Sequence, residues 1–185
     1  MPNSFTTKGQ PSLDQITDTN VANPANSDVL TYQASSGLWV NQPLSIGGIV
    51  KQVVFSSTNS PFTTNQPTPQ DIGLLGTITP SSLTSRIVIL VQLSLTKITN
   101  NIYAAPTAKL FRGSVSTGTQ INIINLMTIN GGQGWAFCFP MNSVDSPNTT
   151  SPQTYTVGIQ VASNLETIGA QRNNSTSTMI LMEID

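Results

Sequence analysis

The chain has 185 residues, only 8% of which are charged, and seven Lys and Arg against eight Asp and Glu give a formal net charge of −1. This length allows one globular domain and a short appendage. The basic residues are scattered rather than clustered, so no nucleic-acid partner is expected. The absence of His excludes Ser-His-Asp and Cys-His catalysis and His-ligated metal sites.

Nothing in the sequence is suited to membrane insertion. The longest strongly apolar run, Ile87 to Val91, is far shorter than the ~20 residues that a membrane-spanning helix needs. The first residues contain no apolar stretch of the kind found in a secretory signal peptide. We therefore expect no membrane insertion and an extracellular location reached by lysis of a host cell.

The N-terminal part of the chain divides into an arm and a small cassette. Residues 1–12 lack hydrophobic periodicity and contain two prolines, which predicts an extended arm. Residues 13–45 contain two short apolar runs, Val29 to Tyr32 and Leu38 to Val40, with turn-forming residues between them. This pattern is typical of a minimal strand-turn-strand unit.

The stretch from Asp28 to Asn41 resembles short turn units of bacteriophage tail-fibre and other virion-surface proteins. The similarity lies in Asp28-Val29-Leu30-Thr31-Tyr32 and Ser36-Gly37-Leu38-Trp39, preceded by Leu13-Asp14-Gln15-Ile16. It implies an anchor that attaches the chain to another virion protein of the capsid or tail. Four apolar side chains are expected to contact that partner: Leu13, Ile16, Tyr32 and Trp39.

Residues 46–185 are predicted to form a β-rich head, which begins after Gly47-Gly48. Strands are expected at Ile49–Ser56, Ser85–Ile98, Ala108–Arg112, Gln120–Ile129, Gly134–Met141, Thr154–Ala162 and Ser177–Ile184. The proline-containing stretch 58–80 is expected to hold only short strand pieces around Ile72–Leu75, and Asn130-Gly131 is expected to form a tight hairpin turn. The predicted fold is all-β, an antiparallel jelly-roll β-sandwich preceded by the arm and the anchor.

Two predicted strands are apolar on both faces. In Ser85–Ile98, Val88 and Leu90 lie opposite the apolar row that starts at Ile87, so both faces of this strand should be covered. In the last strand we expect Ile180, Met182 and Ile184 to face the core, which leaves Met179 and Leu181 outside.

An uncovered apolar face on a sandwich with few charges can be hidden against copies of the same chain. We therefore predict association between copies, with Val88, Leu90, Met179 and Leu181 in the interface, and we expect a homotrimer because jelly-roll heads mounted on fibres pack three-fold. The alternative is a loop that covers this face within one subunit.

Two further strand features concern exposure. Tyr155, Val157 and Ile159 alternate with small or polar residues, which predicts a half-exposed strand. Cys138, the one cysteine, lies between two phenylalanines and is expected to be a buried, inert thiol, and no intrachain disulfide is possible.

The C-terminal hundred residues resemble the tumour-necrosis-factor-like heads of phage fibres. The similarity lies in Asp145-Ser146-Pro147, in Tyr155-Thr156-Val157 and in the terminal run from Ser175 to Ile184. It implies a trimeric jelly roll on a virion. Because the chain has one cassette and almost no shaft, a short spike, a head fibre or a capsid decoration trimer is favoured over a long tail fibre.

No constellation of residues indicates catalysis. Hydrolysis of glycans needs two carboxyl groups roughly 5 to 9.5 Å apart, and no obvious pair occurs among Asp14, Asp18, Asp28, Asp71, Asp145, Glu166, Glu183 and Asp185. Gly131 to Gly134 is not followed by the Lys-Ser/Thr of a phosphate loop. Asp14, Asp18 and Asn20 lack the spacing of an EF-hand, so neither a metal nor a cofactor is expected.

The sequence thus predicts a non-enzymatic virion structural protein, a homotrimeric fibre, spike or capsid decoration protein whose head serves in host attachment. Host-surface glycan is a candidate ligand of that head. One alternative is a tail-fibre receptor-binding protein that recognises host glycan, and another is a cellular lectin-like or cytokine-like trimer.

Overall fold

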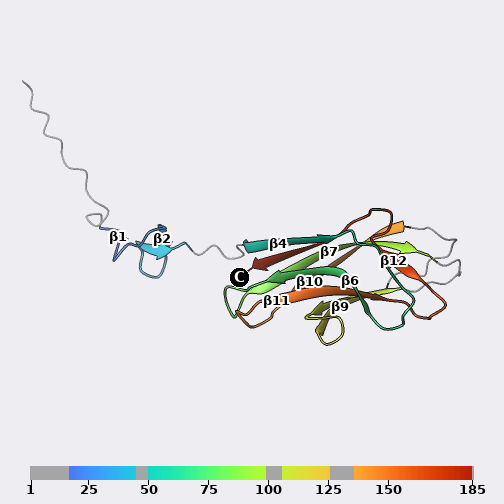
Figure 1. Ribbon diagram of the computed structural model, residues 1–185. Helices are drawn as coiled ribbons and strands as arrows, with labels where there is room; N and C mark the ends of the chain where they lie inside the picture. The colour runs from blue at the N-terminus through green and yellow to red at the C-terminus, as the bar shows by residue number, and fades with distance from the viewer. Residues whose placement is uncertain (1–16, 45–49, 99–105, 126–135, 185) are drawn as a thin grey trace, which may run out of the picture. The chain divides into compact units, whose positions relative to one another are not determined.

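A computed structural model describes residues 17–44, 50–98, 106–125 and 136–184 (Figure 1). The chain divides into two compact units, Met1–Gly47 and Gly48–Asp185, called unit 1 and unit 2 here. The described residues contain only strands, turns and irregular segments, and none forms a helix that could cross a membrane. The predicted Asn130-Gly131 turn lies outside the described residues.

Unit 1 is a three-stranded sheet. Its strands are β1 (Thr19–Asn20), β2 (Asp28–Gln33) and β3 (Leu38–Pro43), with β3 in the centre, antiparallel to β2 and parallel to β1. The β2–β3 turn closes with hydrogen bonds from the backbone N–H groups of Ser36 and Gly37 to the carbonyl of Gln33, and Gly37 has φ +69°. Glycine adopts this left-handed conformation without steric cost.

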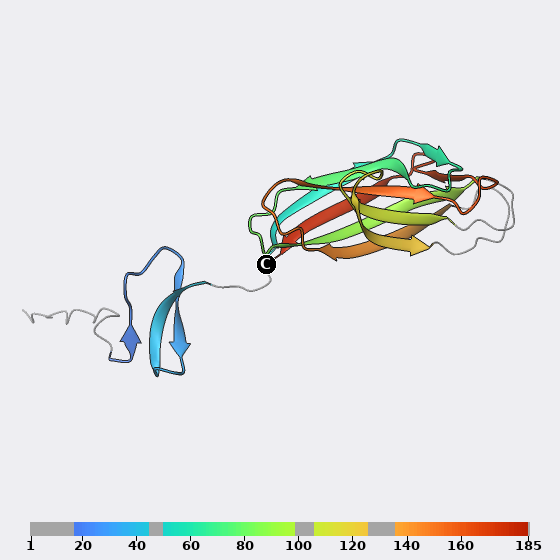
Figure 2. The ribbon, with the colours of Figure 1, turned by 90° about the horizontal axis from the view of Figure 1, so that it is seen from below.

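Unit 2 consists of two packed sheets. Its strands are β4 (Val50–Thr58), β5 (Phe62–Thr64), β6 (Gln70–Ile78), β7 (Arg86–Lys97), β8 (Thr107–Arg112), β9 (Thr119–Asn125), β10 (Ala136–Asp145), β11 (Gln153–Gln160), β12 (Ile168–Ala170) and β13 (Ser177–Ile184). The first sheet has the order β4-β13-β7-β10, with β12 and β5 continuing beside β7, and the second has the order β6-β11-β8-β9. Figure 1 shows the two layers, and Figure 2 shows the strands from below.

The strand pairing defines a jelly roll. Among the eight longer strands the first pairs with the last, β4 with β13, and the pairing continues inward as β6 with β11, β7 with β10 and β8 with β9, all antiparallel. A hairpin ribbon of four such pairs, rolled so that alternate pairs fall in opposite sheets, gives this fold. The predicted antiparallel jelly-roll sandwich is confirmed for unit 2.

The core lies between the two sheets. It is built from the inward side chains of both, and the row on β7 is the predicted one. The fully or almost fully buried apolar residues include Ile72, Leu74, Ile78, Ile87, Ile89, Val91, Leu93, Leu95, Leu110, Tyr155, Val157, Ile159, Met179 and Leu181. Each large buried side chain contributes roughly 1.5 to 3 kcal/mol, so the packing of these inward side chains between the two sheets is the main contribution to the stability of unit 2.

The two faces of β13 are the reverse of the prediction. Met179 and Leu181 point into the core and are fully buried, while Ile180, Met182 and Ile184 lie on the outer face and are half-buried. Met179 and Leu181 therefore belong to the core of their own subunit, and as interface residues they were wrongly predicted.

Other differences from the sequence concern strand length and exposure. β6 is a continuous nine-residue strand rather than short pieces, and β5 and β12 were not anticipated. β11 is buried on both faces between Tyr155 and Ile159, not half-exposed. Cys138 is exposed, because it occupies an outward position on β10.

Candidate assembly surface

The outer face of the first sheet presents two rows of side chains that cross four strands and are apolar except for Asn142. The pairing of β4, β13, β7 and β10 aligns Phe55, Ile180, Leu90 and Asn142 in one row. It aligns Val53, Met182, Val88 and Val144 in the next. We call these eight residues the outer face.

The outer face is open to solvent at its margins. Phe55 is 64% exposed, Val53 58% and Val144 55%, while the apolar side chains of the central strands are half-buried. Neither row contains an ionisable side chain, and Arg86 lies in the adjoining row, paired with Ile184. An exposed, contiguous apolar patch without charge is a feature of protein interaction surfaces.

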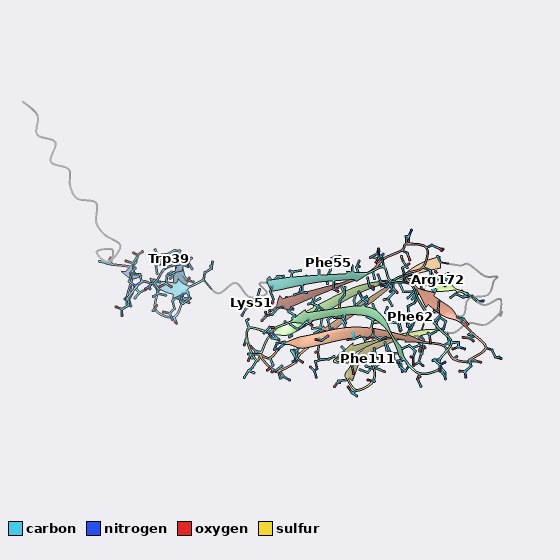
Figure 3. All side chains as sticks on the ribbon, in the orientation of Figure 1. Trp39, Lys51, Phe55, Phe62, Phe111 and Arg172 are labelled. Carbon is cyan, nitrogen blue, oxygen red and sulfur yellow. The ribbon has the colours of Figure 1, made fainter. Side chains whose placement is uncertain are left out.

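A shallow hollow of about 240 Å³ lies in this face. It is lined by side chains and backbone of the two central strands and of the edge strand β10, namely Leu90, Val91, Gln92, Pro140, Asn142, Thr178 and Ile180. Most of this lining is apolar. Phe55 comes from β4, the opposite edge strand, and Figure 3 labels it there.

The second sheet differs, because a loop of the chain covers part of its outer face. The β8–β9 loop folds over β11 so closely that a Cβ added at Gly158 would lie 2.8 Å from Val115 Cγ1. Gly158, which faces outward on β11, is consequently buried, and Thr156 on the same face is buried as well. Within the described residues, a comparable loop does not cover the outer face of the first sheet, so that face is the candidate for contact with another molecule.

A second hollow, of about 280 Å³, is more polar. Its lining comes from the start of β6 and from the β8–β9 loop, namely Pro69, Gln70, Asp71, Ser114, Val115 and Ser116. This lining includes no aromatic ring on which a sugar could stack.

Glu183 forms a buried anionic cluster at one end of the first sheet. Its side chain is fully buried, and its Oε1 accepts hydrogen bonds from Ser81 N (2.7 Å), Ser81 Oγ (2.6 Å) and Ser85 Oγ (2.6 Å). Gln52 Nε2 donates to Oε2 at 2.6 Å. Burial opposes ionisation, but these hydrogen bonds outweigh it and lower the pKa of Glu183 from 4.5 to about 2. The cluster fixes the β6–β7 turn to the last strand.

A second polar cluster joins the two sheets. Arg112 Nη1 on β8 donates to both carboxylate oxygens of Asp145 at the end of β10, at 3.2 and 3.0 Å. Tyr155 Oη on β11 donates to Asp145 Oδ2 at 2.7 Å. Burial, followed by this hydrogen bond, raises the pKa of Tyr155 above its ordinary value.

Several acids considered for catalysis have structural partners. Glu183 and Asp145 are engaged in these two clusters, and Asp71 Oδ1 accepts a hydrogen bond from Gly73 N at 2.8 Å. Within residues 17–44, 50–98, 106–125 and 136–184, Asp, Glu and Cys do not gather in a group of three that would hold a metal ion.

Unit 1 presents its own exposed apolar side chains. None of residues 17–44 is buried, and Val29, Leu30, Tyr32, Trp39 and Leu44 are all exposed. The rings of Tyr32 and Trp39 face each other across β2 and β3 with centroids 5.6 Å apart. A sheet of this size lacks the buried core that gives independent stability.

The loop that precedes β2 is held by Asn41. Its side chain exchanges hydrogen bonds with the backbone of Ala22 and donates to Asp28 Oδ2 at 2.8 Å. A hydrogen bond from the backbone of Ala25, followed by that from Asn41, lowers the pKa of Asp28. Unit 1 is thus ordered by polar contacts and not by apolar burial.

The predicted site residues lie in three different parts of the chain. Val88 and Leu90 lie on the outer face, Tyr32 and Trp39 lie together on unit 1, and Leu13 and Ile16 fall outside the described residues. Sequence reasoning missed Val53, Phe55 and Val144, the most exposed members of the outer face. The alternation in β4 could have indicated them, because it places Val53 and Phe55 on one face of the strand and Val54 on the other, so both faces of β4 carry apolar residues.

No protein-family model matches the chain, and no curated protein does. Solved structures with some similarity include that of the infectious bursal disease virus Gx strain, with a TM-score of 0.45 and 12% identity over 85% of this chain. The VP2 subviral particle of the same virus gives a TM-score of 0.39 and 12% identity over 83% of this chain. The chain spans 37% of the length of each of these two viral chains. Latent PorU from Porphyromonas gingivalis gives a TM-score of 0.29 and 10% identity over 77% of this chain and 15% of its own.

Proposed function

We propose that this chain is a non-enzymatic structural protein of a virion, a homotrimeric fibre, spike or capsid decoration protein of a bacteriophage. Residues 1–45 attach it to another virion protein of the capsid or tail. Residues 46–185 form a head that projects at the virion surface and adheres to the host. Its location is the virion surface, and it becomes extracellular after host lysis.

The observation that carries this proposal is the uncovered outer face of unit 2. Two rows of apolar side chains on a rigid sheet offer a surface for association, and they offer no group for turnover. Such a face is stable in solution when a partner covers it. A copy of the same chain is a partner that is always available, and closed rings of copies are the usual outcome.

Unit 1 supports the attachment role. It has no buried residue among those described and exposes an aromatic pair, so it gains apolar burial by docking on a partner. The resemblance of Asp28 to Asn41 to virion-surface turn units supports the proposal that this partner is another virion protein.

The attachment is tested with full-length chains supplied during infection. A variant that carries Tyr32→Ser and Trp39→Ser is expected to accumulate as folded protein but to be absent from purified particles, as is a chain that lacks residues 1–45. The matched control is Leu83→Ser, which changes an exposed apolar residue in a turn of unit 2 and should leave incorporation unchanged. Incorporation of all variants at equal levels would contradict attachment through residues 1–45.

The alternatives give different results. A tail-fibre receptor-binding protein would bind host glycan, and purified chain on a glycan array would show it. If the chain were a cellular lectin-like or cytokine-like trimer, even the unaltered chain would be absent from purified particles.

A further inference from the structure

We propose that Phe55 of one copy inserts into the outer-face hollow of the next copy, and that three such contacts close the ring. The inference rests on the proposed trimeric function and names the surface that forms it. It assigns a role in the contact to three residues that the sequence did not indicate: Val53, Phe55 and Val144.

The first half of the contact is a protruding side chain. Phe55 is a large apolar residue, 64% exposed, on β4, which is an edge strand of the first sheet. Its neighbour on the same face, Val53, is 58% exposed. Aromatic side chains that enter a pocket of the partner are the usual anchors of protein interfaces.

The second half is the hollow of about 240 Å³ over β7, β10 and β13. A cavity of about 150 Å³ is large enough to bind benzene, so the hollow has room for a phenyl ring. Leu90, Pro140 and Ile180 supply apolar walls, and Asn142 and Thr178 supply polar groups at the margin.

The chemistry of the face fits a second copy. Neither row has an ionisable side chain, so contact between these rows of two copies brings no like charges together, and Arg86 lies outside them in the adjoining row. Phe55 is the largest exposed apolar side chain of the face, and the exposed Val53 and Val144 add to the apolar area that the contact buries.

The two halves of the contact lie on the same face. Phe55 lies on the edge strand β4, and the hollow begins on the adjoining strand β13, where Ile180 pairs with Phe55, and extends to β10. A contact in which Phe55 of one copy enters the hollow of the next without the reverse insertion is heterologous, and a heterologous contact closes as a ring when its rotation allows. A face-to-face dimer would instead insert both Phe55 rings reciprocally.

The test is the mass of the full-length chain under native conditions, without and with Phe55→Glu. The unaltered chain is expected at three copies. Phe55→Glu, which brings a carboxylate to the apolar hollow, is expected to raise the concentration of half-dissociation by roughly 30-fold or more. The matched control is Leu75→Glu, because Leu75 is 47% exposed on the outer side of the second sheet, and this variant should stay trimeric. Thermal unfolding of both variants shows that each is folded.

A disulfide cross-link tests the geometry directly. In a Cys138→Ser background, Phe55→Cys and Asn142→Cys are separated by three strand spacings within one copy, about 14 Å, which is too far for an internal disulfide. Air oxidation of the double variant is expected to give covalent trimers on a non-reducing gel, and each single variant should remain uncross-linked through this pair.

Each outcome bears on one claim. Covalent dimers without trimers would overturn the ring. A Phe55→Glu variant that remains trimeric would overturn the Phe55 contact and leave the proposed function standing, since the trimer would then use another surface. An unaltered chain that is monomeric but incorporated into particles would overturn the trimer and not the virion role.

Discussion

Replacement of Glu183 by Gln is expected to destabilise unit 2 far more than its small change of shape suggests. The carboxylate is fully buried and accepts four hydrogen bonds, three of them on Oε1. An amide keeps the volume but removes the charge. It also places an NH₂ group where one of the carboxylate oxygens accepts now.

The conflict cannot be relieved by rotating Gln52. Gln52 Nε2 donates to Glu183 Oε2 and also to the carbonyl of Thr79, at 2.5 Å. If the new amide directs its NH₂ at Gln52, two donors face each other, and a flip of Gln52 then sets its oxygen against the Thr79 carbonyl. Either arrangement loses one hydrogen bond of the cluster, which costs about 0.5 to 1.5 kcal/mol. The remaining hydrogen bonds to residue 183 also become weaker because their acceptor is no longer charged. Together, these effects are expected to lower the free energy of unfolding by about 3 kcal/mol.

The assay is urea unfolding at one protein concentration and several pH values, because association also contributes to stability. The pKa of Glu183 is lowered in the folded state, so its contribution is complete above the unfolded value of about 4.5 and is lost as the pH falls through about 2. The unaltered chain should lose this stability between those values, and Glu183→Gln should lack that part of the pH dependence. Two results would refute the assigned role of the cluster. One is a free energy of unfolding for Glu183→Gln within about 0.5 kcal/mol of the unaltered chain at pH 7, and the other is an unchanged loss of stability at acid pH in this variant.

Three further substitutions test the packing of unit 2. Gly158→Ala places a methyl group against Val115 and should lower the free energy of unfolding by about 1 to 3 kcal/mol. In a double-mutant cycle, adding Val115→Ala should restore much of that loss. Independent effects of the two substitutions would show that the loop does not rest on β11. Tyr155→Phe removes the hydroxyl that donates to Asp145 and should cost about 1.5 to 3 kcal/mol in urea unfolding, and a loss under 0.5 kcal/mol would show the bond to be unimportant. Leu181→Ala should lower the free energy of unfolding by about 2 to 5 kcal/mol because Leu181 is in the core. Val144→Ala, at an exposed position, should lower it little in the isolated subunit. Equal losses would contradict the assignment of Leu181 to the inner face and Val144 to the outer face of the first sheet.

The sequence predicted the fold class because period-two patterns and turn residues recur through unit 2. The inward row of β7 followed directly from its alternation. Strand β13 was assigned the wrong way round because it is apolar on both faces, so its alternation does not show which face is buried. Glu183 shares the face of Met179 and Leu181 and is buried, since Ser81 and Ser85 supply hydrogen bonds from about a hundred residues away. Local pattern carries no information on such donors.

The candidate surface was predicted only in its centre. Val88 and Leu90 were identified because β7 is apolar on both sides, whereas the exposed margin at Phe55 depends on β4 lying at the edge of the sheet. The burial of β11 depends on a loop that crosses it at Gly158. Both are properties of the assembled fold and leave no periodic signal in the sequence.

Labelling purified virus particles with a gold-conjugated antibody against unit 2, followed by electron microscopy, tests the central claim most directly. The account predicts gold on the particles, spread over the capsid for a decoration or head-fibre trimer, or confined to the tail for a receptor-binding fibre. Particles that carry no gold, from a lysate in which the antibody detects the chain, would contradict the proposed virion role.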